Sequence, residues 1–124
     1  MKATATYNSD QLQIDQTDED QTITLRFLGK SILRDPSQFV MPILQKTLTE
    51  ANKGKKRLVM DFRDLTYMNS STLTPVIKIL EIARVGEGQV TALYRKSLKW
   101  QDISFSALSI FGTQDGRIEV SGVE

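Results

Sequence analysis

The sequence predicts an α/β fold in which one mixed, mostly parallel sheet has helices packed on it. Two observations predict this fold class. Strand-like and helix-like segments alternate through most of the chain, and the run at 57–62 is short and almost wholly apolar. Alternation of this kind implies right-handed crossovers between parallel strands. The expected order of elements is β-β-α-β-α-β-α-β, arranged as a small sandwich of sheet and helices.

Residues 1–20 are mostly polar and predict a strand and turns at the start of the chain. Leu12 and Ile14 alternate with polar neighbours, which is typical of an edge strand, and residues 17–20 form an acidic hairpin tip. The next strand is expected over 21–28. There, apolar and polar residues alternate, which predicts one buried face.

The first helix is expected to have Asp35 as its N-cap and Pro36 at its first helical position. Pro42 lies inside the same apolar pattern, where a proline removes a backbone hydrogen bond. We therefore expect a regular helix over 42–53, preceded by a looser or kinked turn and followed by Gly54 as its C-terminal cap.

The remaining elements follow from the same kinds of pattern. The apolar run 57–62 predicts a strand that is covered on both faces. Helical spacing of apolar residues at 72–85 and 97–111 predicts two more helices. Short apolar segments at 89–94 and 117–120 predict two more strands.

Composition narrows the classes of function. The chain has 124 residues, with 16 basic and 15 acidic side chains, which suits one domain over 1–124 and no nucleic-acid partner. Cysteine and histidine are both absent, so we expect no catalytic residue, no metal and no cofactor. The sequence shows no signal peptide and no apolar run long enough for a membrane span. The expected protein is cytoplasmic and is not an enzyme.

The most informative segment covers residues 58–80, with the sequence LVMDFRDLTYMNSSTLTPVIKIL. A buried strand ends near Asp61, an apolar turn closes with Met68, and the run NSSTL at 69–73 opens a helix. This segment resembles the STAS family, the anti-sigma-factor antagonists and their relatives. Their pattern is a strand with an Asp near its end, an apolar turn, and then Asp-Ser-Ser/Thr-Gly-Leu. The order of elements over 21–121 is similar as well.

The resemblance implies a partner-switching regulator. In that family a GHKL-type kinase phosphorylates a hydroxyl at the helix N-terminus, a PP2C-like phosphatase reverses this, and the unphosphorylated form binds its downstream regulator. The usual acceptor maps to Ser71. In a biofilm-control branch that also has Asn before the hydroxyl run, the acceptor maps to Ser70. Asn69 and Thr72 stand where the family pattern has Asp and Gly.

The residues alone allow two interpretations of this run. Asn, Ser and Thr before a helix are common N-caps. A helix N-terminus also accommodates a phosphate, whose charge would break a packed interface. Pro75 leaves two helix starts open. With Asn69 as the cap, Pro75 lies near the sixth helical position; with Thr74 as the cap, it takes the favoured first position and both serines lie in an exposed loop.

The helix after the motif has apolar residues away from its main stripe, namely Ile79, Ile82 and Val85. A neighbouring helix or loop would cover them in one interpretation. In the other they form an exposed patch for a partner or a second copy, which leaves a homodimer open. STAS-like domains usually meet partners around this helix and the loop before it. The resemblance therefore implies five docking residues: Asn69, Thr72, Leu73, Ile79 and Ile82.

Two alternative functions remain open. A non-phosphorylated STAS scaffold subunit of a larger complex, such as a transporter, would need neither serine. A carboxylate-based enzyme or ligand-binding domain would need a deep polar pocket near Asp61. Asp61 and Asp64 also have a simpler interpretation, in which one of them hydrogen-bonds the turn after the strand.

Overall fold

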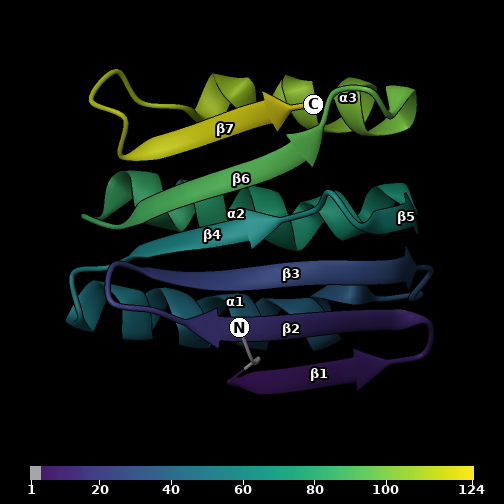
Figure 1. Cartoon of the computed structure of the whole chain (residues 1–124), viewed down its shortest axis with the longest axis horizontal. Coiled ribbons are helices and arrows are strands. Elements are labelled where there is room, and N and C mark those ends of the chain that lie inside the picture. Colours follow the sequence, from purple (N-terminus) through teal and green to yellow (C-terminus); the bar gives the residue numbers. More distant parts are fainter. Residues whose placement is uncertain (1–3) are drawn as a thin grey trace.

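The computed structural model describes residues 4–124, and the fold is organised around one sheet (Figure 1). Within these residues the sheet has seven strands, with three α-helices and two 3-10 helices. The mixed, mostly parallel sheet with helices packed on it confirms the predicted fold class. The strands are β1 (Ala5–Ser9), β2 (Leu12–Asp18), β3 (Thr22–Ser31), β4 (Arg57–Asp61), β5 (Leu65–Met68), β6 (Gln89–Arg95) and β7 (Ile118–Val123). The helices are α1 (Pro36–Lys53), η1 (Ser70–Thr72), α2 (Leu73–Val85), α3 (Lys99–Ser106) and η2 (Ala107–Phe111).

The sheet changes from antiparallel to parallel pairing at β3. β1, β2 and β3 form an antiparallel meander, and β4, β6 and β7 follow parallel to β3 in that order. β4 pairs with the first part of β3, and β5 pairs with its last residues, so that Met68 lies beside Ser31. The segment after β5 therefore begins next to the end of β3, where the parallel strands end.

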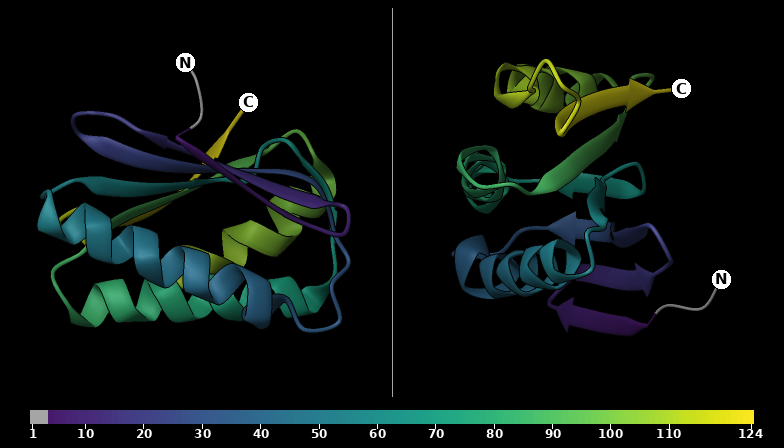
Figure 2. Two further views of the ribbon diagram at one scale, coloured as in Figure 1. Left: turned by 90° about the horizontal axis from the view of Figure 1, so that it is seen from below. Right: turned by 90° about the vertical axis from the view of Figure 1, so that its left-hand side faces the viewer.

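The helices all lie on one face of the sheet (Figure 2). Ile23, Leu25 and Phe27 of β3 are buried beneath them, as the alternating pattern of this strand predicts. The Phe62 ring, just after β4, lies 4.6 Å from the ring of Phe27 and 4.6 Å from that of Phe105 in α3. These contacts join the strands and the helix layer into one core.

The opposite face of the sheet has no helix over it among residues 4–124. The expectation that the strand at 57–62 is covered on both faces was therefore wrong. β4 lies between β3 and β6, and the neighbouring strands shield its side chains on the open face. Val59 is half-buried there without a second helix layer.

Three other differences from the predicted elements have physical causes. The pattern missed β1, whose residues are mostly small and polar, and β5, where a register shift between Gly29 and Lys30 leaves two successive residues exposed. α1 begins at Pro36, as predicted, but it stays helical through Pro42, where a looser or kinked turn was expected. Pro42 is exposed, so water can reach the carbonyl group that its missing N–H leaves free.

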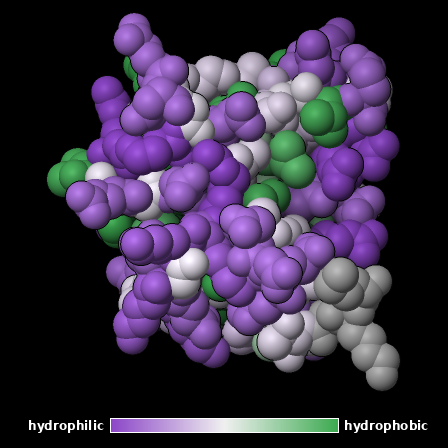
Figure 3. All heavy atoms as spheres, turned by 60° about the vertical axis from the view of Figure 1, so that its left-hand side comes forward, coloured by the Kyte–Doolittle hydropathy of each residue, from purple (hydrophilic) through white to green (hydrophobic). Residues whose placement is uncertain are grey.

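The side of the molecule where β4, β6 and β7 begin is mostly hydrophilic (Figure 3). Apolar side chains appear there as small separate areas. Among the described helices, none combines the length and the apolar character needed to cross a membrane.

Candidate functional site

The NSSTL run lies between the end of β5 and the start of α2. Asn69 has an extended backbone, with φ −79° and ψ 162°, and its N–H donates to the Ser31 carbonyl over 3.0 Å. Ser70 to Thr72 then form the 3-10 turn η1, and Leu73 opens α2. The pairing with β3 therefore fixes the position of the turn relative to the sheet.

A chain of buried and half-buried hydrogen bonds holds the turn from beneath. The Thr72 hydroxyl donates to Asn69 Oδ1 over 2.9 Å. Thr72 has one hydroxyl hydrogen, so its 2.6 Å contact with Ser31 Oγ has Ser31 as the donor. The Asn69 amide in turn donates to the Leu33 carbonyl over 2.9 Å. Ser31 and Thr72 are both fully buried.

This network changes the roles predicted for Asn69 and Thr72. Thr72 is inaccessible, because its side chain fills the space between η1 and β3, so it cannot contact a partner directly. Asn69 occupies the N-cap position of η1, but its side chain makes no cap hydrogen bond there. Its amide links the segment after β3 to the turn. Both residues shape the turn, which sequence spacing alone could not show.

Ser70 and Ser71 lie on the same turn but outside this network. Both are exposed, and their side chains take no part in the hydrogen bonds beneath the turn. They occupy the first two positions of η1, where backbone N–H groups have no partner within the helix. The positive end of the helix dipole is therefore close to both hydroxyls.

Pro75 follows the first of the two predicted arrangements: Asn69 is the N-cap residue of η1, and η1 continues directly into α2, so Pro75 is the sixth residue after the cap. α2 begins at Leu73, so Pro75 is its third residue, and η1 precedes it. At this position the missing N–H belongs to the first turn of the α-helix, where such groups lack a helical partner. The serines therefore lie in a defined 3-10 turn and are nevertheless exposed.

Of the docking residues predicted on α2, some are buried in the structure and others are exposed. Ile79 is fully buried, so its predicted place in an exposed patch was wrong. α2 lies between α1 and α3 in the helix layer, and a helix in that position buries more than one stripe (Figure 1). Leu73 is half-buried against the core. Ile82 is 48% exposed and Val85 is 91% exposed, so these two remain accessible.

Two exposed apolar residues near the turn were not predicted from the sequence. Ile32, next to the buried Ser31, is 39% exposed, and Tyr67, two residues before Asn69, is 50% exposed. The register shift in β5 places Tyr67 opposite the exposed Lys30. A partner that contacts the serines would therefore find apolar side chains on the neighbouring chain segments.

The two carboxylates after β4 form ion pairs with arginines. Asp61 Oδ1 accepts hydrogen bonds from the Arg63 backbone N–H and Nε, and Oδ2 accepts one from the Arg63 guanidinium over 2.8 Å. This confirms that one carboxylate hydrogen-bonds the turn. Burial alone would raise the pKa of Asp61, but the bonds from Arg63 outweigh it and hold that pKa below its ordinary value.

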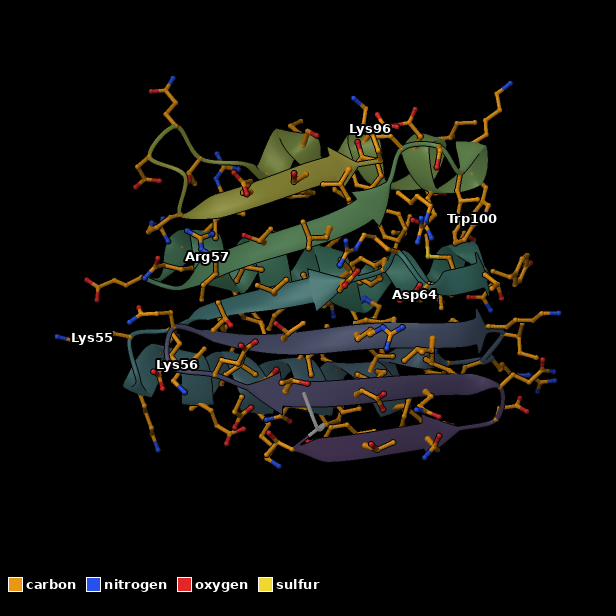
Figure 4. All side chains as sticks on the ribbon, viewed as in Figure 1. Lys55, Lys56, Arg57, Asp64, Lys96 and Trp100 are labelled. Carbon is orange, nitrogen blue, oxygen red and sulfur yellow. The ribbon has the colours of Figure 1, made fainter. Side chains whose placement is uncertain are left out.

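Asp64 lies beside this turn and bridges two strands (Figure 4). Its carboxylate is 2.7 Å from Arg26 Nε of β3 and 3.7 Å from an Arg95 nitrogen of β6. Among residues 4–124, no group of three or more acidic side chains is placed to hold a metal ion. Since Arg63 occupies both oxygens of Asp61, that carboxylate has a structural role in the turn.

The basic run near the start of β4 lies at the other end of the sheet. Figure 4 shows Lys55, Lys56 and Arg57 at the end opposite β5. The Arg57 guanidinium donates to the carbonyls of Gly116 and Arg117 over 3.0 and 3.2 Å. It therefore ties β4 to the segment before β7, far from the serines.

No model of a known protein family matches this chain. A search of curated proteins found no match either. The likeness to STAS domains therefore depends on the motif at 58–80 and on the order of the elements.

Proposed function

We propose that this protein is a cytoplasmic, non-enzymatic regulator of the STAS type that binds a partner protein around η1 and releases it on phosphorylation. Ser71 is the proposed acceptor, with Ser70 as the second candidate. A serine/threonine kinase and a PP2C-like phosphatase would set the phosphorylation state. The partner would be a downstream regulator.

One observation carries the proposal: two exposed serines lie on a turn that is held rigidly from beneath. The bonds among Ser31, Thr72 and Asn69 fix the backbone while both serine hydroxyls stay accessible. A kinase needs an accessible hydroxyl, and a binding surface needs a fixed shape. The turn supplies both within three residues.

The chemistry of the surroundings explains how phosphate would act as a switch. A phosphoserine carries a charge of about −1.5 to −2 at pH 7. The free N–H groups and dipole at the start of η1 accommodate that charge, so the fold itself survives it. A partner packed on Ile32 and Tyr67 would instead have to bury the phosphate against apolar side chains. The charge therefore weakens binding and leaves the domain folded.

The test compares partner binding by the full unmodified chain and by three variants of it. The unmodified protein and Ser71→Ala are each used to capture proteins from the native cells, alongside Ser71→Glu. The control is Ser109→Glu, an exposed serine in the other 3-10 helix. We expect one partner to be retained by the unmodified protein, Ser71→Ala and Ser109→Glu, and to be lost with Ser71→Glu.

Replacing Ser70 in the same way decides between the two serines. If Ser70→Glu releases the partner and Ser71→Glu does not, Ser70 is the acceptor. A partner that binds all of the glutamate variants equally would contradict the switch. If the double variant Ser70→Ala/Ser71→Ala also kept its regulation in cells, the protein would be a scaffold subunit.

A further inference from the structure

The first strand leaves one edge of the sheet open. β1 is the outermost strand on its side and lies past α1, and no described residue pairs with its outer edge (Figures 1 and 2). The unpaired N–H and C=O groups of such an edge can hydrogen-bond another strand. Proteins usually protect an open edge with charged residues, proline or a bulge. β1 has the sequence ATYNS, which contains no charge and no proline.

We propose that β1 pairs with β1 of a second copy of this chain, antiparallel and about a two-fold axis, to give one continuous sheet across a dimer. A two-fold axis perpendicular to a sheet relates the two edge strands as an antiparallel pair. Centring the axis on Tyr7 is the register that pairs all five residues of β1. Ala5 then lies opposite Ser9, Thr6 opposite Asn8, and Tyr7 opposite Tyr7.

The residues of β1 suit this register. The pattern is symmetric about Tyr7, with a small residue at each end and an exposed polar residue on each side. No charged side chain of β1 meets a like charge across the axis. The carboxylate of Asp15, which accepts a hydrogen bond from Thr6 over 3.1 Å, belongs to β2 and so lies one strand away from the proposed interface.

Tyr7 gives a second reason to expect that a second copy of this chain pairs with the open edge of β1. Its hydroxyl donates to Gln16 over 2.9 Å, and Lys46 Nζ of α1 lies 6.0 Å from the ring centroid. The ring is nevertheless only half-buried, because no further strand follows β1. In the proposed register the two Tyr7 rings lie directly opposite each other, and aromatic pairs across strands stabilise a sheet.

The pairing is short, so the dimer is expected to be weak. Two five-residue strands bury less surface than the roughly 1,200–2,000 Å² of a stable complex. Sedimentation equilibrium from about 10 µM to about 1 mM should therefore show a mass that rises from one chain toward two. A mass of one chain across this whole range would overturn the proposal.

Two charge variants locate the interface. Thr6→Lys with Asn8→Lys places cations opposite cations on both sides of the axis, and should weaken dimerisation at least tenfold. Thr6→Lys with Asn8→Asp places each cation opposite a carboxylate, and should dimerise at least as tightly as the unmodified chain. Self-association that is equal in both variants would contradict pairing through β1.

Amide hydrogen exchange tests the proposed dimer in the unmodified chain, without any substitution. As the protein concentration rises, amides of β1 should become more protected, while amides of the other outer strand, β7, should not change. If protection in β1 does not depend on concentration, the proposed dimer is wrong. Circular dichroism of the two variants at low concentration checks that each one is folded.

Discussion

Thr72 illustrates at the scale of one residue how the candidate site is built. Its hydroxyl donates to Asn69 and accepts from Ser31, and all of its surface is buried. A glycine, which the family pattern has at this position, could make neither side-chain bond. The threonine therefore links the start of α2 to the end of β3 beneath the two serines.

The first prediction concerns this hydroxyl. Thr72→Val keeps the shape but leaves Ser31 Oγ and Asn69 Oδ1 without their partner, so we expect the free energy of unfolding to fall by about 1–3 kcal/mol. Thr72→Ser, which retains the hydroxyl, should show a smaller fall in the free energy of unfolding. Urea denaturation of the two variants and the unmodified chain measures the difference. Equal stability of Thr72→Val and the unmodified chain would show that the network adds nothing.

The second prediction concerns the pH dependence that Asp61 contributes. The pKa of Asp61 is lower in the folded protein than in the unfolded chain, because the bonds from Arg63 outweigh the effect of burial. The ionised carboxylate therefore stabilises the fold above its unfolded pKa of about 4, and this stabilisation is lost as the pH falls through the folded pKa.

Asp61→Asn should consequently lower the free energy of unfolding by about 2–3 kcal/mol at pH 7. This loss should become smaller as the pH falls below about 4. Asp64→Asn is the matched control, since its ion pairs are partly exposed and should contribute about 0–1 kcal/mol. Denaturation of both variants from about pH 3 to 7 makes the comparison. A constant cost for Asp61→Asn over this range would refute the linkage.

Single residues show how far the sequence can specify a site. The spacing of the NSSTL run places both serines at a helix start, and the structure agrees. The partner of Thr72 could not be predicted, because Ser31 is 41 positions earlier in the chain and meets it only through the pairing of β3 with β5. Tyr67 and Ile32 were missed for the same reason.

At the scale of elements, β3 is the strand on which the site depends. It pairs with β4 in its first half and with β5 at its end, and the register shifts between Gly29 and Lys30. Gly29 has φ 86°, and a Cβ there would overlap the Gln11 carbonyl oxygen. The shift lets β5 take the place of β4, so that η1 begins beside Ser31.

The third prediction tests this junction. Gly29→Ala meets both a left-handed backbone and a steric overlap with Gln11, so it should destabilise the fold by about 2 kcal/mol or more. Gly116→Ala is the control, because Gly116 has φ 78° but open space around its Cβ position, and should cost about 1 kcal/mol. Thermal unfolding compares the two variants. Equal losses would mean that the overlap at Gly29 is relieved without cost.

The sequence pattern predicted the helices and strands more reliably than it predicted which of their residues are buried by neighbouring elements. The start of α1 at Pro36 and the alternating face of β3 follow from local pattern. The burial of Ile79 does not, because it depends on α2 lying between two other helices. β1 was missed because a strand of small polar residues has little hydrophobic pattern and is fixed by its pairing with β2.

At the scale of the whole molecule, the core and the candidate site lie in different parts of the fold. Helices cover one face of the sheet and enclose the core, while η1 lies at the end of the sheet where β3 ends (Figure 2). A charge added at Ser71 therefore meets solvent and free backbone N–H groups, and does not enter the core.

The fourth prediction follows from this separation. Ser71→Glu should change the melting temperature by no more than about 2 °C, because a negative charge near a helix N-terminus is neutral or slightly favourable. Its far-ultraviolet circular dichroism should match that of the unmodified chain. A large loss of stability would mean that the turn cannot carry charge, and release of a partner by this variant would then reflect unfolding.

The central claim is that Ser71 or Ser70 carries a phosphate in the native cells. The most direct measurement is the intact mass of the protein recovered from those cells under several growth conditions, followed by peptide mapping of residues 58–84. The account predicts a species with one added phosphate group, located on one of these two serines. An unmodified mass under every condition, including overexpression of the cognate kinase, would contradict the switch.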